Sequence, residues 1–210
     1  MKLTTLDALF HHELKDLYDA EHQIIKALPK LAKAANSAEL SEAFEDHLAQ
    51  TREHIARLES VFGEIGKSPS RETCAGMKGL LEEGNKVLEE EADPPVKDAA
   101  LISAAQRAEH YEMAAYGTLR TWARILGYEE SARLLEETLD EEEGTDSALT
   151  GLATKINPEA AAGDDTAEPA DGDRESGRKT STDNATRSQS GATAKKQGQR
   201  QRTSKSTARR

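Results

Sequence analysis

The chain has 210 residues, of which 32% are charged and only 4% are aromatic, a balance that suits long amphipathic helices better than a sheet. Its single cysteine, Cys74, excludes an internal disulfide, so a reducing compartment, the cytoplasm, is the natural expectation. We expect neither a membrane span, since no apolar run approaches the roughly 20 residues required, nor a signal peptide, since the N-terminus lacks an apolar core and a small-residue cleavage site.

The first two predicted helices cover residues 5–35 and 38–64. Apolar residues recur in both at spacings of three and four, which is the periodicity of one helix face. Pro29 lies inside the first pattern and is expected to kink or loosen that helix, because proline has no backbone N–H to donate. Ser37 is a suitable N-cap for the second helix.

Three further helices are predicted downstream. Residues 71–92 form a short, Glu-rich helix that two prolines terminate, and residues 96–126 and 129–155 form two long helices. The short loop inside each long pair makes its helices antiparallel neighbours, and the connection of about 30 residues between the pairs allows a crossover. The sequence therefore predicts an all-α four-helix bundle with a short extra helix in the crossover.

The composition changes after Pro158. Residues 159–210 contain no Leu, Ile, Val or aromatic residue, and such a segment cannot bury enough apolar surface to offset the entropy lost on ordering. We therefore expect a helical bundle over residues 1–158 and a disordered tail over residues 159–210. The tail is basic from Arg174 onwards, with a net charge of +9, which leaves −20 for the residues before it. A flexible basic arm can contact nucleic-acid phosphate weakly and without sequence preference, or it can dock on the acidic bundle.

Several polar side chains fall on or beside the apolar stripes of the four long helices. Residues three or four positions apart share a helix face, and polar pairs at these spacings occur in three of the helices. Burying several carboxylates together is very costly unless cations compensate them, and carboxylates with imidazole suit iron or manganese. The sequence therefore predicts a buried site for two such ions. The candidate ligands are Glu21, Gln50, His54, Glu109, Glu112, Glu142 and Asp146.

Each of these residues also has an ordinary structural explanation. In a chain with this many charges a lone acid such as Glu21 is usually on a solvated face, and a lone imidazole such as His54 is more often a core or interface residue. Residues 141–143 are by themselves an acidic surface stretch. The metal interpretation gains support only because four helices each offer a candidate at a compatible depth. Gln50 weakens it, because a neutral amide is a poorer ligand than a carboxylate.

Four segments of the chain carry a family resemblance. They are LFHHELKDLYDAEHQIIKALPKLAKAA, AFEDHLAQTREHIARLE, DAALISAAQRAEHYEMAAYGTLRTWA and LLEETLDEEEGTDSALTGLA. Together they resemble the YciF/YciE-like family of bacterial stress proteins, a family of uncharacterised domains in the ferritin-like superfamily. The resemblance covers about three-quarters of the chain, from about Leu3 to Asn157, and the AQRAEHYEMAAYGTL stretch is its most specific part.

The resemblance implies a ferritin-like, rubrerythrin-like bundle that forms a homodimer. The AEHQ stretch is similar to the first-helix ligand segment of rubrerythrins, which implies Glu21 as a ligand. The QTREH stretch is similar to their second-helix segment and places His54 at the imidazole position. Thr51 falls where their carboxylate would be, which leaves Gln50 as the candidate substitute.

The third and fourth long helices complete the implied ligand set. The EHYE stretch matches the third-helix pair of rubrerythrins and implies Glu109 and Glu112. In the fourth helix Asp146 stands where rubrerythrins have a histidine, and Glu142 lies one turn before it. No rubredoxin-type cysteine cluster follows, so electron delivery of that kind is not expected.

The sequence is compatible with two functions. One is a stress-response protein with a carboxylate-bridged di-iron or di-manganese centre, an oxidoreductase or peroxidase-like enzyme acting on peroxide, oxygen or ferrous iron. The other is a non-enzymatic dimeric stress or interaction module, whose inner polar residues form a hydrogen-bond network without metal and whose tail associates with DNA. Metal content separates the two, because only the first requires bound ions.

Overall fold

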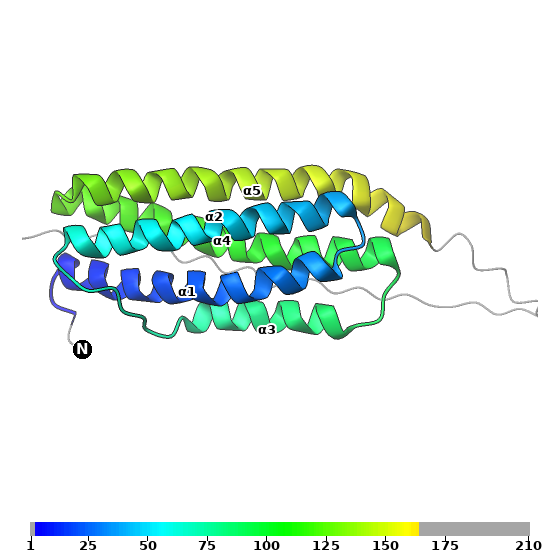
Figure 1. Cartoon of the computed structure of the whole chain (residues 1–210), viewed down its shortest axis with the longest axis horizontal. Coiled ribbons are helices and arrows are strands. Elements are labelled where there is room, and N and C mark those ends of the chain that lie inside the picture. The colour runs from blue at the N-terminus through cyan, green and yellow to red at the C-terminus, as the bar shows by residue number, and fades with distance from the viewer. Residues whose placement is uncertain (1–2, 164–210) are drawn as a thin grey trace, which may run out of the picture. The chain divides into compact units, whose positions relative to one another are not determined.

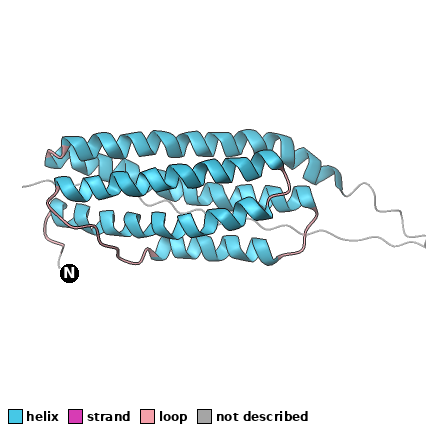
Figure 2. Ribbon diagram, in the orientation of Figure 1, coloured by secondary structure: helices cyan, strands magenta, loops and turns pink. Residues whose placement is uncertain are grey.

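The computed structural model describes residues 3–163, which form five helices and contain no strand (Figures 1 and 2). The helices are α1 (Leu6–Ala34), α2 (Ala38–Glu64), α3 (Ala75–Glu89), α4 (Pro94–Leu126) and α5 (Glu129–Ala162). The predicted all-α bundle with a short extra helix in the crossover is confirmed. None of the helices in this part of the chain combines the length and apolar character that crossing a bilayer requires. The predicted basic arm lies outside the described residues.

The four long helices form two antiparallel hairpins, α1 with α2 and α4 with α5. The hairpins pack together through α2 against α5 and α1 against α4. The crossover returns the chain along the length of the bundle, so α4 begins at the end where α2 begins and the two helices run parallel (Figure 1). Hydrogen bonds from the α1–α2 loop to Asp98, near the start of α4, hold this end together.

The short helix α3 lies outside the bundle, against α1 and α4 (Figure 1). Its start is tied to α1, because the backbone N–H of Cys74 donates to Asp19 at 2.9 Å and the Gln23 amide donates to the Cys74 carbonyl at 3.1 Å. Its end is tied to α4, because Lys97 Nζ donates to three carbonyl oxygens of the last turn at 2.5–2.9 Å. Both ends of α3 are therefore fixed to the bundle.

Four prolines of the described residues lie inside a helix or at its start. Helix α1 continues through Pro29, and Pro94 and Pro95 are the first two residues of α4, where a missing N–H removes no helical bond. Helix α5 continues through Pro158 to its end at Ala162, so it passes the predicted end near residue 155 and includes residues 159–162, which were predicted to belong to the disordered tail. The buried side chain of Ile156 anchors this last stretch to the bundle.

The buried positions of each long helix alternate in spacings of three and four, as in the seam of a coiled coil. In α1 they include Phe10, Leu14, Leu17, Glu21, Ile24, Leu28 and Leu31. In α2 they include Leu40, Phe44, His47, Thr51, His54, Leu58 and Val61. Apolar side chains thus fill the seam at both ends, and polar side chains interrupt it near the middle of the bundle.

Candidate metal centre

Six acidic and imidazole side chains meet in the middle of the bundle, and every long helix contributes to them. None is more than 3% exposed. They are Glu21 of α1, His47 and His54 of α2, Glu109 and Glu112 of α4, and Glu142 of α5. They occupy seam positions, so the same periodicity that builds the apolar core turns these side chains inward.

The six residues form two overlapping groups, in each of which one potential ligand atom per residue lies within 4.8 Å of the others. The first group is His47, Glu109, Glu112 and Glu142, and the second group is Glu21, His54 and Glu142. Glu142 belongs to both. Two ligand groups that share one carboxylate have the composition expected of a site for two metal ions.

His54 is held between carboxylates on opposite sides of its ring. Its Nε2 lies 2.9 Å from Glu141 Oε2, and its Nδ1 lies 3.0 Å from Glu142 Oε1 and 3.8 Å from Glu21 Oε1. Arg57 fixes Glu141 from the far side through two nitrogens at 2.6 and 2.8 Å. Because Glu141 engages Nε2, the ring presents Nδ1 to the interior, as outer partners commonly do for metal-binding histidines.

His47 approaches the site from the same helix, two turns before His54. Its Nε2 lies 3.3 Å from Glu109 Oε1, and its Nδ1 lies 3.4 Å from the hydroxyl of Thr145. Burial lowers the pKa of His47, even though the charge of Glu142 opposes the shift. The ring is therefore neutral at neutral pH, which is the form that binds metals.

Burial and mutual repulsion oppose ionisation of the acidic groups. Burial raises the pKa of Glu109 and of Glu112 well above the ordinary value, and the charge of Glu142 adds to the effect. Burial also raises the pKa of Glu21 to about 8, although the charge of His54 opposes it. Burial disfavours the charge of Glu142 as well, but contact with His54 outweighs it and keeps that pKa low. The metal-free site therefore keeps most of its carboxyl groups protonated.

The hydrogen bonding of the site is incomplete. In the part of the chain that the structure describes, ten buried side-chain nitrogen and oxygen atoms lack a hydrogen-bond partner, and seven of them are here. The seven are Glu21 Oε2, His54 Nδ1, Glu109 Oε2, and both carboxylate oxygens of Glu112 and of Glu142; of these, His54 Nδ1 and Glu142 Oε1 form a close ion pair at 3.0 Å that lacks hydrogen-bond geometry. Buried polar atoms are nearly always paired, so this concentration fits a site that binds cations.

Five of the seven predicted ligands come together in these groups: Glu21, His54, Glu109, Glu112 and Glu142. The other two lie beside the site and are half-buried. Asp146 accepts a hydrogen bond from Gln106 at 3.0 Å, and Gln50 accepts one from Thr145 at 3.4 Å. At this level of α5 residues 145 and 146 share the inward-facing position and both are half-buried. Asp146 is therefore turned towards the outer side of α4, where it meets Gln106.

His47 was missing from the predicted set. It lies seven residues before His54, and a separation of seven returns to the same face of a helix after two turns. Thr51, which is 1% exposed, lies between the two histidines on this face. The signal was therefore present in the sequence as a His-x3-Thr-x2-His spacing.

Comparisons with known proteins agree with this architecture. Residues 5–162 match the family described as "Domain of unknown function (DUF892)". The chain is 47% identical to Protein YciF of Escherichia coli (strain K12) over 162 residues, which is 76% of this chain and 98% of that protein.

Solved structures give the same result. The crystal structure of the E. coli stress protein YciF matches with a TM-score of 0.72 at 46% identity, covering 74% of this chain and 99% of that one. The protein YcfI of Rhodopseudomonas palustris matches with a TM-score of 0.69 at 41% identity, covering 71% and 95%. The resemblance predicted from four sequence segments is confirmed, and with it the ferritin-like fold. The chain therefore belongs to the DUF892 family, and E. coli YciF is one of its relatives.

Proposed function

We propose that this protein is a stress-response protein that binds two iron or manganese ions in the middle of its bundle. The observation that carries the proposal is the set of four buried glutamates whose oxygens mostly lack partners. Four ionised carboxylates carry a charge of −4, which two divalent cations neutralise. The stress role is supported by the description of the E. coli relative as a stress protein.

The residues of each group have distinct roles in this proposal. The first group would hold one ion and the second group the other, with Glu142 as the carboxylate common to both. Ferritin-like proteins that bind two iron or manganese ions also draw carboxylates and imidazoles from four helices. Here α4 supplies two glutamates three residues apart, and α2 supplies two histidines seven residues apart.

The bound ions would supply redox chemistry towards peroxide, dioxygen or ferrous iron. The protein itself orients the ligands and excludes bulk water. Tyr116 is fully buried and donates a hydrogen bond to Glu21 Oε1, which leaves Oε2 of the same carboxylate free. The Arg57–Glu141 pair holds the outer nitrogen of His54. Glu109 and Glu112, whose pKa values burial raises, hold protons that metal binding would release.

Elemental analysis tests the proposal directly. Protein purified without chelators, and again after anaerobic loading with ferrous or manganous ions, should contain about two ions per chain. Replacement of His47 by Ala should lower that content, whereas replacement of the exposed His110 by Ala should not. Fewer than one ion per chain after loading would overturn the proposal. The same six residues would then be a protonated hydrogen-bond network in a structural, non-enzymatic module.

A further inference from the structure

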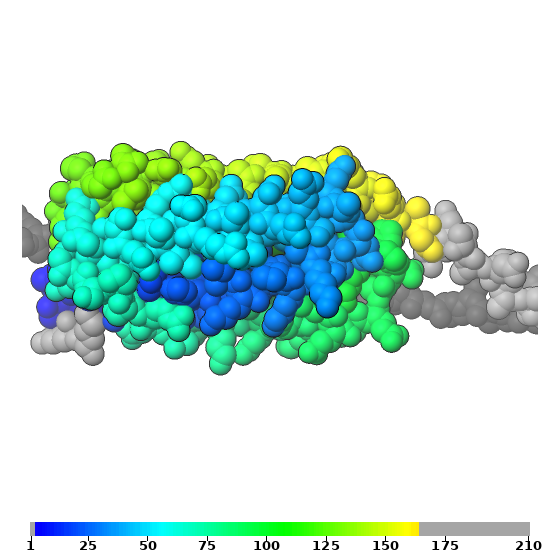
Figure 3. Space-filling view, viewed as in Figure 1, coloured from blue at the N-terminus to red at the C-terminus, as the bar shows by residue number. Residues whose placement is uncertain are grey.

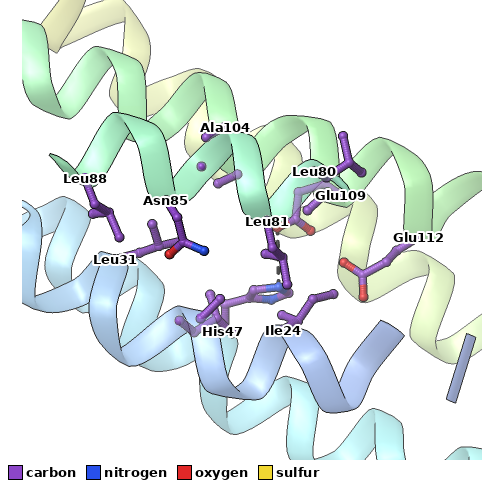
Figure 4. Close-up of a pocket in the computed structure, with 15 residues that line it drawn as sticks. Ile24, Leu31, His47, Leu80, Leu81, Asn85, Leu88, Ala104, Glu109 and Glu112 are labelled. Carbon is purple, nitrogen blue, oxygen red and sulfur yellow. Dashed lines mark ion pairs between the residues drawn. The ribbon is translucent and has the colours of Figure 1, made fainter. Parts of the chain in front are cut away.

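A small apolar cavity lies beneath α3 and reaches the candidate metal centre (Figure 4). Its volume is about 40 Å³, and fifteen residues line it. Only four of the fifteen are polar: His47, Asn85, Glu109 and Glu112. Three of these four belong to the first ligand group, and no residue of the second group lines the cavity. The cavity therefore approaches the centre from one side.

Small residues on facing helices leave this space open. Gly84 is one of only two buried residues of α3, and a Cβ added to it would meet the Cβ of Ala104 at 3.7 Å. Ala105 and Ala108 of α4 also line the cavity. Because α3 is fixed at both ends, it cannot simply collapse onto α4 to close the gap. The volume of the cavity is therefore determined by the small side chains that line it, because the surrounding helices are held in place.

The size and lining of the cavity restrict what can occupy it. A volume of 40 Å³ has room for about three molecules the size of water, which excludes most metabolites. Apart from Asn85, the polar residues of the lining are the three ligand residues His47, Glu109 and Glu112, and the other walls, which include Leu81 and Leu88 of α3, offer no hydrogen bonds. A polar guest such as hydrogen peroxide or a hydrated ion would lose its own hydrogen bonds along these apolar walls. An uncharged, apolar diatomic molecule loses none.

We infer that the cavity beneath α3 is a dioxygen site that delivers this molecule to the first-group side of the centre. This inference rests on the proposed function and narrows its substrate class from three candidates to one. Two ferrous ions would supply two electrons, which with two protons convert one dioxygen molecule to one hydrogen peroxide. The residues of the cavity take no part in that transfer and act only by admitting the gas.

Xenon tests the cavity without any metal. Crystals of metal-free protein under xenon pressure should show a bound atom between α1, α3 and α4, because dry apolar cavities bind xenon. Ala108→Leu, which fills the space, should abolish the peak, whereas Ala114→Leu, an exposed position of the same helix, should retain it. If Ala108→Leu does not fold, Leu81→Ala enlarges the cavity and should raise the xenon occupancy. Absence of xenon from the wild-type cavity overturns the inference.

Stopped-flow oxidation tests delivery. In protein loaded anaerobically with ferrous ions, Ala108→Leu should slow oxidation by dioxygen about tenfold, since a filled path raises the barrier to entry, without lowering the iron content. Ala114→Leu should match the wild type. Equal rates in the two variants overturn delivery. The two failures are separable, because an iron content below one per chain overturns the proposed function, whereas xenon binding reports on the cavity alone.

Discussion

Two buried carboxylates of α4, two heptads apart on the same helix face, have opposite surroundings. Asp98 is 3% exposed and accepts hydrogen bonds from the backbone N–H groups of Asn36 at 2.8 Å and Ser37 at 2.7 Å. Glu112 is 1% exposed, and neither of its oxygens has a partner. Both side chains are almost fully buried, but only Asp98 has hydrogen bonds that replace those it would make to water.

The difference separates a structural carboxylate from a candidate ligand. Asp98 joins the α1–α2 loop to the start of α4 and needs no further group. Glu112 faces other acids, and the charge of Glu142 raises its pKa beyond the effect of burial. Burial alone is therefore a poor marker of a functional site in a helical bundle. The marker is a buried carboxylate that the protein leaves without donors.

The largest expected effect comes from removing the carboxylate that both ligand groups share. Glu142→Ala should lower the affinity for manganous ions about a thousandfold, because breaking a buried charge pair costs about 3–5 kcal/mol. Calorimetric titration of the metal-free protein measures it. The matched control is Glu143→Ala, the exposed neighbour of Glu142 in the chain. Equal affinities in the two variants would mean that Glu142 does not hold metal.

Asp98→Ala should be the most destabilising change that leaves metal binding intact. It removes the acceptor of two part-buried backbone donors, and each hydrogen bond to a charged group contributes about 1.5–3 kcal/mol, so the free energy of unfolding should fall by about 3 kcal/mol. Urea unfolding of the metal-free protein measures the loss. Asp93→Ala is the control, since Asp93 precedes α4 without a side-chain capping bond. A loss no larger than that of the control would remove the distinction between the two kinds of carboxylate.

The pH dependence of metal binding tests whether the acids of the centre, unlike Asp98, are protonated in the metal-free protein. Glu21, whose pKa burial raises to about 8, is protonated in the metal-free protein at lower pH, so an ion must displace its proton. Between pH 6 and pH 8 this proton alone should make the affinity for manganous ions rise about fiftyfold, and each further proton displaced from His54, Glu109 or Glu112 should make the rise steeper. Titrations in two buffers of different ionisation enthalpy count the protons released. An affinity that does not change over this range would contradict the protonated state.

The stability of the metal-free protein provides the control, because it should decrease with rising pH while the affinity for metal increases. The pKa of Glu21 is raised above its ordinary value of 4.5, so its contribution to stability is complete below pH 4.5 and is lost as pH rises through about 8. His54, with a pKa raised from 6.5 to about 9, changes in the same direction over its own range. The free energy of unfolding should therefore decrease from pH 5 to pH 8 without metal, and added metal should reverse the trend.

Glu112→Leu should stabilise the metal-free protein, in contrast to Asp98→Ala. A leucine removes a buried acid that has no hydrogen-bond partner, so the free energy of unfolding should increase by about 2 kcal/mol. The same variant should bind less metal. Urea unfolding and elemental analysis on one preparation measure both quantities. A destabilised metal-free variant would show that Glu112 has a structural role that its contacts do not reveal.

The sequence of α2 contained more information than the prediction used. Leu40 and Phe44 begin an alternation of four and three residues, and its continuation gives His47, Thr51, His54 and Leu58. The prediction included Gln50 because it lies four residues before His54, and so it assigned the inner face one position too early. Strict use of the seam would have found His47. Most helix limits were close to those predicted, because local signals such as Ser37 and Gly127 set them.

Other features of the site depend on contacts that no local pattern contains. Asp146 is four residues after Glu142, yet its side chain is bound to Gln106, 40 residues away in the chain. Which of two adjacent residues faces the centre depends on the rotation of α5 against α4. Glu141 belongs to a run of three acids that is typical of an exposed surface stretch. Its pairing with Arg57, 84 residues away in the chain, instead places it against the outer nitrogen of the candidate ligand His54.

Glu141 is a third kind of carboxylate, and its replacement should give the smallest effect. It is partly exposed, and contact with Arg57 lowers its pKa, so it is charged at neutral pH. Glu141→Gln keeps the shape but removes the charge behind His54, and loss of such an outer partner weakens metal binding about tenfold. Only the ion of the second group should be affected, so the manganese titration should become biphasic. Glu137→Gln is the control, because Glu137 also contacts Arg57 but is not among the partners of His54. If both variants weaken binding equally, the position of Arg57 controls the site, and Glu141 does not orient the imidazole.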